Sequence, residues 1–149
     1  MYSHLDDAMR DATLLALEQM AFLLGGAPDD RSAPAAAQAV VAFEGPLHGS
    51  LALVLHGDLL PSLAANMLGT DDVPAESLQQ DALGELANVI CGNVLPRIGG
   101  PAATFRLARP RVTNVVGNPH PGEVARAHVR VDDGSLDVRL YVDSPPEVV

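Results

Sequence analysis

The fold of this chain is decided by one stretch, residues 81–93, which reads "DALGELANVICGN". Four polar or small residues recur in it at steps of four, three and four: Asp81, Glu85, Asn88 and Gly92. At about 100° per residue, these four lie within roughly 60° of one another on a helix. The stretch therefore predicts a helix with one polar face that carries neither lysine nor arginine. The opposite, core-facing side is apolar and consists of Leu83, Leu86, Ala87, Ile90 and Val94.

The polar face is unusual for a helix that serves stability alone. Asp81 and Glu85 are like charges at i,i+4, which costs roughly 0.2–0.5 kcal/mol in an isolated helix. Gly84 and Gly92 are each about 1 kcal/mol worse than alanine in a helix interior. A glycine on the polar face removes bulk and leaves a floor that another protein can approach. Solvated faces of this kind are also common on surface helices, so the pattern alone fits either a binding face or a solvated one.

The composition indicates one globular domain with an acidic surface. The chain has 149 residues, of which 48% are hydrophobic, and this is enough for a single core. Its formal net charge is −10, and all of its cationic side chains apart from histidine are arginine. Nucleic acids and anionic membranes bind clustered lysine and arginine, so we expect neither as a partner.

The sequence carries no pattern for export or membrane insertion. Its apolar run near the N-terminus, "LLALEQMAFLL", is interrupted by Glu18 and Gln19 and is far shorter than the ~20 residues of a membrane span. The single cysteine, Cys91, excludes an intramolecular disulfide and a cysteine-based zinc site. We therefore expect a cytoplasmic protein.

Turn residues divide the chain into the elements of an α+β domain, within the broad α/β class. Helices are expected over residues 4–24, 58–69 and 75–95, the second with Asp58 as its N-cap. By composition, residues 25–38 form a loop and residues 144–149 a frayed tail. Strands are expected at 39–45 and 49–57, as a hairpin, and at 103–113, 122–132 and 135–143, as a meander.

The two halves of the chain repeat the order helix, then strands. The strand "GSLALVLHGD" from Gly49 resembles the strand "GSLDVRLYVD" from Gly134. Aligning Glu18 of the first helix with Glu85 of the later one places an alanine where the later helix has Asn88. We expect two degenerate, pseudo-symmetric halves, of which only the second keeps the asparagine.

The pattern D-x3-E-x2-N in "DALGELAN", with "GN" following, resembles the active-site helix of the CheC/CheX/FliY family of bacterial chemotaxis phosphatases, and most closely its single-site CheX-type members. The order helix, hairpin, two helices and three strands is similar as well, as is the hairpin "FEGPLHGSLALVL". The resemblance covers residues 13–142 and implies a single CheC/CheX-like domain with antiparallel strands packed against helices. The family places a proline twenty-three positions after the asparagine, whereas Pro110 follows Asn88 by twenty-two and position 111 is arginine.

The resemblance also implies a function. The family hydrolyses the aspartyl phosphate of CheY-type response regulators in two-component chemotaxis signalling. Asn88 would enter the regulator's active site and orient the attacking water, and Glu85 would pair with a cationic side chain of the regulator. Asp81 would have a supporting role, and Gly92 would leave clearance for the partner. A divalent metal such as Mg²⁺ would sit on the regulator, so no cofactor and no metal site are expected on this chain.

Two further expectations concern partners. CheX-type proteins form dimers through their strands, so the resemblance implies a homodimer, for which an exposed β edge would be the physical basis. The alternative to catalysis is a non-catalytic signalling module that binds a receiver domain or a second copy of itself.

Other reactive side chains give no comparable pattern. The five histidines show no metal-ligand spacing supported by acidic residues, and turn or edge positions explain His48 and His56. Asp81 with Glu85 as an acid/base pair for sugar hydrolysis is disfavoured, because the chain has no tryptophan to stack on a sugar. Cys91 is interpreted as a semi-buried small hydrophobe rather than as a nucleophile.

Overall fold

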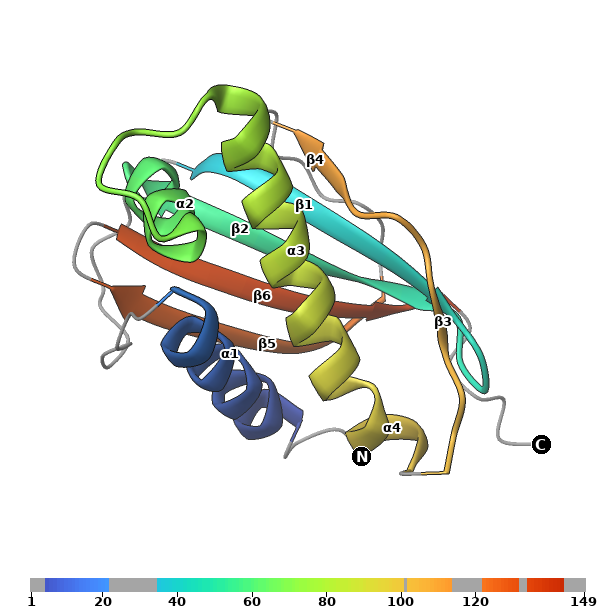
Figure 1. Ribbon diagram of the computed structural model, residues 1–149. Helices are drawn as coiled ribbons and strands as arrows, with labels where there is room; N and C mark the ends of the chain where they lie inside the picture. Colours follow the sequence, from blue (N-terminus) through green and yellow to red (C-terminus); the bar gives the residue numbers. More distant parts are fainter. Residues whose placement is uncertain (1–4, 22–34, 101, 114–121, 132–133, 144–149) are drawn as a thin grey trace.

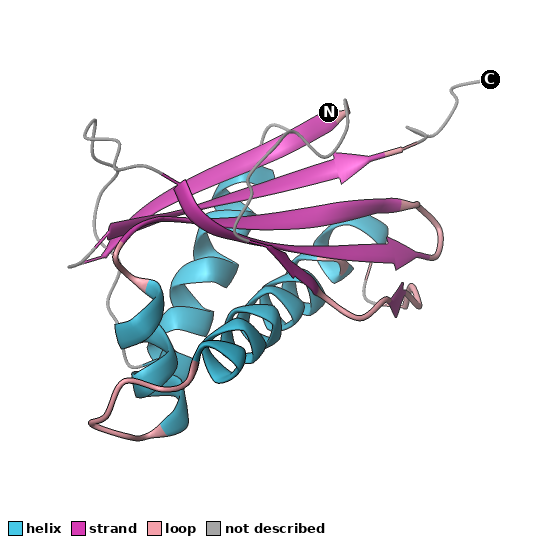
Figure 2. Ribbon diagram, turned by 90° about the horizontal axis from the view of Figure 1, so that it is seen from above, coloured by secondary structure: helices cyan, strands magenta, loops and turns pink. Residues whose placement is uncertain are grey.

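Six strands form one antiparallel sheet, and the helices of the described residues lie on one of its faces (Figures 1 and 2). The computed structural model describes residues 5–21, 35–100, 102–113, 122–131 and 134–143. The elements follow in the order α1 (Leu5–Ala21), β1 (Ala35–Glu44), β2 (Gly49–Gly57), α2 (Leu60–Leu68), α3 (Glu76–Val94), α4 (Pro96–Gly99), β3 (Arg106–Leu107), β4 (Arg111–Thr113), β5 (Glu123–Val131) and β6 (Gly134–Val142).

The strands run in the order β3-β1-β2-β6-β5, and β4 also pairs with β1. The inner strands β2 and β6 therefore have hydrogen-bonded neighbours on both sides, which fits their buried, β-branched and leucine-rich sequences. The edges are formed by β5 on one side and by the short strands β3 and β4 on the other. Among the described residues, no helix is long and apolar enough to cross a membrane.

The two halves of the chain meet at the pair of β2 and β6. Gly49 lies opposite Val142, and Gly57 lies opposite Gly134. At the centre of this register Leu53 faces Val138, and each is the fourth residue after the glycine that opens its strand. The two similar strands are thus related by a local two-fold axis, which confirms the predicted pseudo-symmetric halves.

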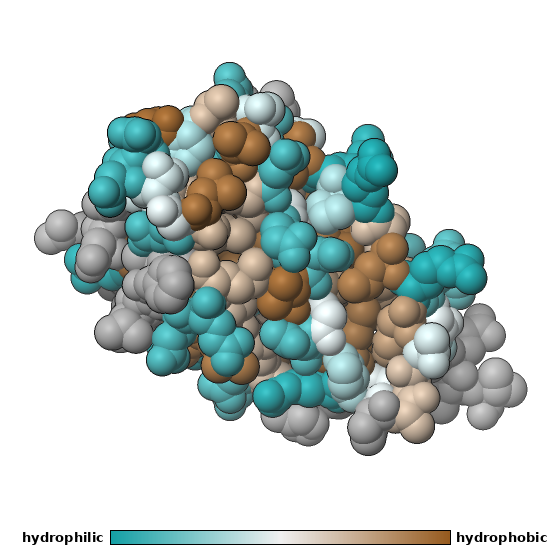
Figure 3. All heavy atoms as spheres, in the orientation of Figure 1, coloured by the Kyte–Doolittle hydropathy of each residue, from teal (hydrophilic) through white to brown (hydrophobic). Residues whose placement is uncertain are grey.

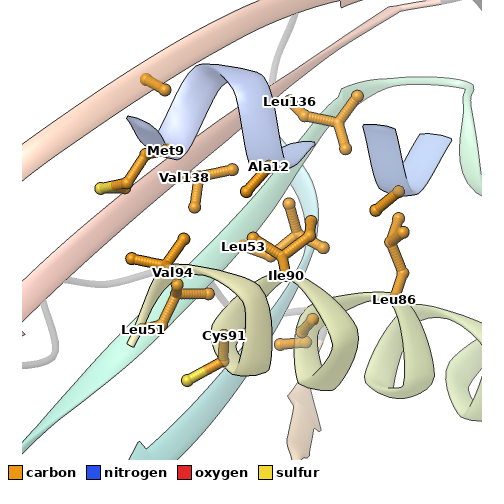
Figure 4. Close-up of a cluster of buried hydrophobic side chains, with 14 of the residues drawn as sticks. Met9, Ala12, Leu51, Leu53, Leu86, Ile90, Cys91, Val94, Leu136 and Val138 are labelled. Carbon is orange, nitrogen blue, oxygen red and sulfur yellow. The ribbon is translucent and has the colours of Figure 1, made fainter. Parts of the chain in front are cut away.

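The two long helices, α1 and α3, each pack against a strand from the other half of the chain. Helix α1 packs against β5, which belongs to the second half, and α3 packs against β1, which belongs to the first. The core lies between these helices and the sheet, where side chains of α1 and α3 meet those of β2 and β6 (Figure 4). The apolar face predicted for α3 is confirmed, because all five of its residues are fully buried: Leu83, Leu86, Ala87, Ile90 and Val94.

The first half of the chain differs from the sequence prediction at two places. Strand β1 begins at Ala35, inside the segment expected to be loop at 25–38, because alanines at alternating buried positions pair with β2. Asp58 is not the N-cap of α2: that position is Leu59, in the right-handed helical region, and no side chain caps the helix. The hairpin is confirmed. Residues 22–34, which include the predicted end of the first helix, lie outside the described residues.

The second half differs in topology. The predicted strand 103–113 is broken by Ala108, Arg109 and Pro110 into β3 and β4, and both pieces pair with β1. The expected meander is therefore wrong, because β4 and β5 lie at opposite edges of the sheet. Proline lacks the N–H needed for a continuous ladder, which accounts for the break. Asp132, the predicted end of the strand 122–132, and the predicted tail 144–149 lie outside the described residues.

Candidate functional site

Helix α3 presents its polar stripe away from the sheet. Asp81, Glu85 and Gly92 are exposed, and Asn88 is half-buried. The helix is fixed beneath them by its fully buried apolar face, so the four residues sit on a rigid element rather than on a loop. The structure thus brings together all four residues that the sequence singled out.

The carboxamide of Asn88 is not used by the fold. Its Oδ1 atom is buried and has no hydrogen-bond partner among the described residues. Leaving such an atom unsatisfied costs about 1–3 kcal/mol, and buried polar side chains are satisfied in most proteins. A side chain that serves stability alone would be paired or replaced by an apolar one, so Asn88 is available for a ligand or a partner.

The two carboxylates of the stripe are also available. Neither Asp81 nor Glu85 forms a hydrogen bond or an ion pair with any residue that the structure describes. They repel each other weakly at i,i+4 spacing, and a cation from outside the chain would relieve this repulsion.

The two glycines of α3 have different surroundings. A Cβ on Gly92 would have no heavy atom within 4 Å, so this position opens to solvent as expected. A Cβ on Gly84 would lie 3.2 Å from the Cβ of Pro110 and 3.5 Å from Cγ2 of Val112. Gly84 therefore allows the chain between β3 and β4 to lie against the helix, and Pro110, despite its shift by one residue, contacts the site helix.

This close approach forms a hollow of about 400 Å³ between α3 and the chain at β4. Sequence reasoning missed the contribution of that chain segment, in particular Arg109, which is exposed. The break of the predicted strand at Ala108–Pro110 is the signal that marks the segment. The hollow is lined by Gln80, Asp81, Gly84, Glu85 and Asn88 from the helix, and by Arg109, Pro110 and Val112.

Cys91 takes no part in this site. It is fully buried in the core rather than semi-buried as predicted, and burial raises the pKa of its thiol to about 12. A thiol with so high a pKa carries almost no thiolate near pH 7, so the nucleophilic role that the sequence disfavoured has no chemical basis.

A histidine–carboxylate cluster lies elsewhere, on strands β2, β5 and β6. His56 Nε2 is 3.0 Å from Asp137 Oδ2, and His128 Nδ1 is 2.5 Å from Asp137 Oδ1. Burial alone would raise the pKa of Asp137, but the hydrogen bonds and charges of His128 and His56 outweigh it and hold that pKa below its usual value. No group of three or more potential metal ligands is found among the described residues.

Comparison with solved structures identifies the fold. CheX from Vibrio vulnificus matches with a TM-score of 0.74 and 16% identity, over 93% of this chain and 96% of that one. A CheC-like superfamily protein from Shewanella sp. PV-4 matches with a TM-score of 0.74 and 20% identity, over 97% and 100%. A CheX–CheY–BeF₃–Mg²⁺ complex from Borrelia burgdorferi matches with a TM-score of 0.66 and 17% identity, over 93% and 97%. The fold is thus that of CheX and CheC-like chemotaxis proteins.

The sequence itself assigns the family. The profile described as chemotaxis phosphatase CheX matches residues 37–125, which span the sheet hairpin, α3 and the hollow. The chain therefore belongs to the CheX family of chemotaxis phosphatases. No curated protein sequence matches it.

Proposed function

We propose that this protein hydrolyses the aspartyl phosphate of a CheY-like receiver domain, with Asn88 and Glu85 as the residues that matter most. The observation that carries the proposal is the unpartnered carboxamide of Asn88, one helical turn from the unpaired carboxylate of Glu85. Family membership supports a phosphatase, and the complex from Borrelia burgdorferi supports a CheY-type protein as the partner.

Asn88 suits the chemistry of acyl-phosphate hydrolysis. The phosphoryl group is already activated, and its transfer depends mainly on in-line positioning and on charge stabilisation. A carboxamide offers both donors and an acceptor without adding negative charge, so it can hold a water beside a phosphate. A carboxylate at position 88 would repel the dianion.

Glu85 suits docking rather than proton transfer. A carboxylate without an ion pair to any described residue can bind a lysine or arginine of the receiver, away from the phosphoryl group. Asp81, one turn earlier on the same face, adds to this attraction. Gly92, one turn beyond Asn88, leaves open space into which the receiver backbone can fit.

The divalent metal belongs to the receiver in this proposal. The Borrelia burgdorferi complex contains Mg²⁺ and BeF₃ together with CheY. The acidic face of α3 therefore needs no metal of its own, and it approaches a site whose charge the receiver's cation partly neutralises.

Two measurements on one receiver separate catalysis from binding. The receiver is phosphorylated with acetyl phosphate, and phosphate release is followed with and without the protein. We expect faster release with the wild type and a large loss with Glu85→Ala. If the wild type binds the receiver, and Glu85→Ala does not, while phosphate release equals that of the receiver alone, the protein is a non-catalytic receiver-binding module.

A further inference from the structure

A second hollow lies on the other side of the α3 stripe. It has a volume of about 460 Å³, between the C-terminal ends of α1 and α2 and the first half of α3. Apolar side chains form most of it, and Asp81 and Glu85 stand at its rim and also line the polar hollow beside Asn88. Its apolar lining consists of Ala82, which is buried, and of four larger side chains: Met20, Met67, Leu68 and Leu78.

Leu68 and Leu78 are exposed although the same helices contribute to the buried core, whereas Met20 and Met67 are partly buried and pack against that core. Leu68 is 49% exposed and Leu78 is 45% exposed, whereas Leu63 of α2 and Leu83 of α3 are fully buried. Figure 3 shows apolar side chains gathered among hydrophilic ones over α2 and the first turns of α3. Exposed apolar groups that cluster and have a polar rim mark interaction sites, and methionines adapt to the shape of what binds them.

The rim determines what kind of group fits. Two carboxylates without ion pairs to described residues stand on the α3 side, and no arginine or histidine of the described residues lines this hollow. A second copy of this chain would bring its own Asp81 and Glu85 against them in a two-fold contact, and each chain carries a net charge of −10. An apolar side chain flanked by a lysine or arginine satisfies both the hollow and its rim.

The hollow lies close to Asn88 of the polar stripe along the same helix. Leu78 precedes Asn88 by ten residues, which is about 15 Å along an α-helix. A standard protein interface of about 800 Å² per partner extends further than that. The apolar hollow is therefore within reach of a receiver that places its phosphoryl group at Asn88.

We propose that the hollow of Met20, Met67, Leu68 and Leu78 binds an apolar side chain of the phosphorylated receiver, next to a cationic side chain that pairs with Asp81 and Glu85. This inference rests on the proposed function. It separates the residues that set the affinity for the receiver from the residue that sets the rate of phosphate hydrolysis. The apolar hollow sets how tightly the receiver binds, and Asn88 sets how fast the bound receiver loses phosphate.

The test compares three leucines of similar exposure, two that line the hollow and one that does not. Leu78→Gln and Leu68→Gln remove apolar contact from the hollow, while Leu15→Gln changes a leucine of α1 that is 46% exposed and does not line it. With a phosphorylated CheY-like receiver as substrate, we expect Leu78→Gln and Leu68→Gln to raise KM about tenfold with kcat unchanged. Leu15→Gln should keep the wild-type KM. The thermal unfolding midpoint should be the same for all three variants.

A binding titration makes the outcome independent of catalysis. The receiver carrying Mg²⁺ and beryllofluoride is titrated with each variant, and Kd should rise for Leu78→Gln but not for Leu15→Gln. If the wild type binds without hydrolysing phosphate and Leu78 still sets Kd, the proposed function fails and the docking inference holds. The docking inference is overturned if Leu78→Gln and Leu15→Gln have equal Kd, or if the wild type does not bind the receiver. It is also overturned if the wild type is a dimer and Leu78→Gln abolishes that dimer.

Discussion

Gly84 of α3 lies directly against Pro110 of the segment between β3 and β4. A Cβ at position 84 would come within 3.2 Å of the proline Cβ. This contact places Arg109 and Val112 at the edge of the same hollow as Asn88. The site is thus assembled from a helix and from a broken edge strand, and a glycine in the helix lets them approach.

The two glycines of α3 should respond differently to alanine. Alanine favours a helix interior by about 1 kcal/mol over glycine. At Gly92 nothing opposes that gain, so Gly92→Ala should raise the free energy of unfolding by about 1 kcal/mol. At Gly84 the added methyl group must displace Pro110, so Gly84→Ala should gain less or lose stability. Urea denaturation measures both, and equal gains at the two positions would contradict the Gly84–Pro110 contact.

A large side chain at Gly92 should separate stability from function. Beyond its own helix backbone, a Cβ at Gly92 has no described atom within 4 Å, so the thermal unfolding midpoint of Gly92→Leu should stay at or above that of the wild type. The same side chain occupies the clearance proposed for the receiver, so kcat/KM for dephosphorylation should fall at least tenfold. Asn93→Leu, exposed but off the stripe, is the control. Full activity in Gly92→Leu would show that no partner approaches there.

Arg109 should contribute charge to the site. It lines the polar hollow beside two carboxylates, and a phosphorylated receiver brings further negative charge. Arg109→Ala should lower kcat/KM about three- to tenfold at low salt, and the difference from the wild type should shrink near 0.5 M salt, because screening weakens such attraction. Arg97→Ala on α4 is the control, because it removes an arginine that is also exposed but lies outside the hollow. If kcat/KM falls equally in Arg109→Ala and Arg97→Ala, the effect comes from the change in net charge and not from the position of Arg109 in the hollow.

The Asp137 cluster predicts an acid-dependent stability. Its pKa is lowered in the folded state, so its contribution is present above the unfolded pKa of about 3.9 and is lost as the pH falls through the folded pKa. Asp137→Asn should lower the free energy of unfolding by about 1–3 kcal/mol at pH 6. The difference should narrow below about pH 4. Asp11→Asn, an exposed helix residue, is the control, and a difference for Asp137→Asn that is equal at pH 3 and pH 6 would contradict the lowered pKa.

The residues that α3 contributes to the site were predictable from sequence, because the helical repeat of apolar residues determines which side of the helix is buried. Leu83, Leu86 and Ile90 mark the buried side of α3, so the opposite position of Glu85 and Asn88 follows from 3.6 residues per turn. The strands that begin at Gly49 and Gly134 were recognised as similar from sequence, but their pairing at the centre of the sheet was not predicted.

The remaining parts depend on contacts between distant segments. Nothing local in "RLARPRV" states that β3 and β4 pair with β1 rather than with β5, and the meander prediction failed there. Arg109 joins the site only because Pro110 meets Gly84, twenty-six residues earlier. The apolar hollow combines ends of three helices, and periodicity within one helix cannot report how far Leu68 and Leu78 stay exposed.

We propose that the Asn88 carboxamide drives dephosphorylation, while the rest of α3 binds the receiver. The most direct measurement is the rate of phosphate loss from a phosphorylated CheY-like receiver, at saturating concentrations of wild type and of Asn88→Ala. We predict that the wild type accelerates the loss, and that Asn88→Ala leaves it at the rate of the receiver alone while binding the beryllofluoride form with wild-type affinity. Equal acceleration by wild type and Asn88→Ala would contradict the account.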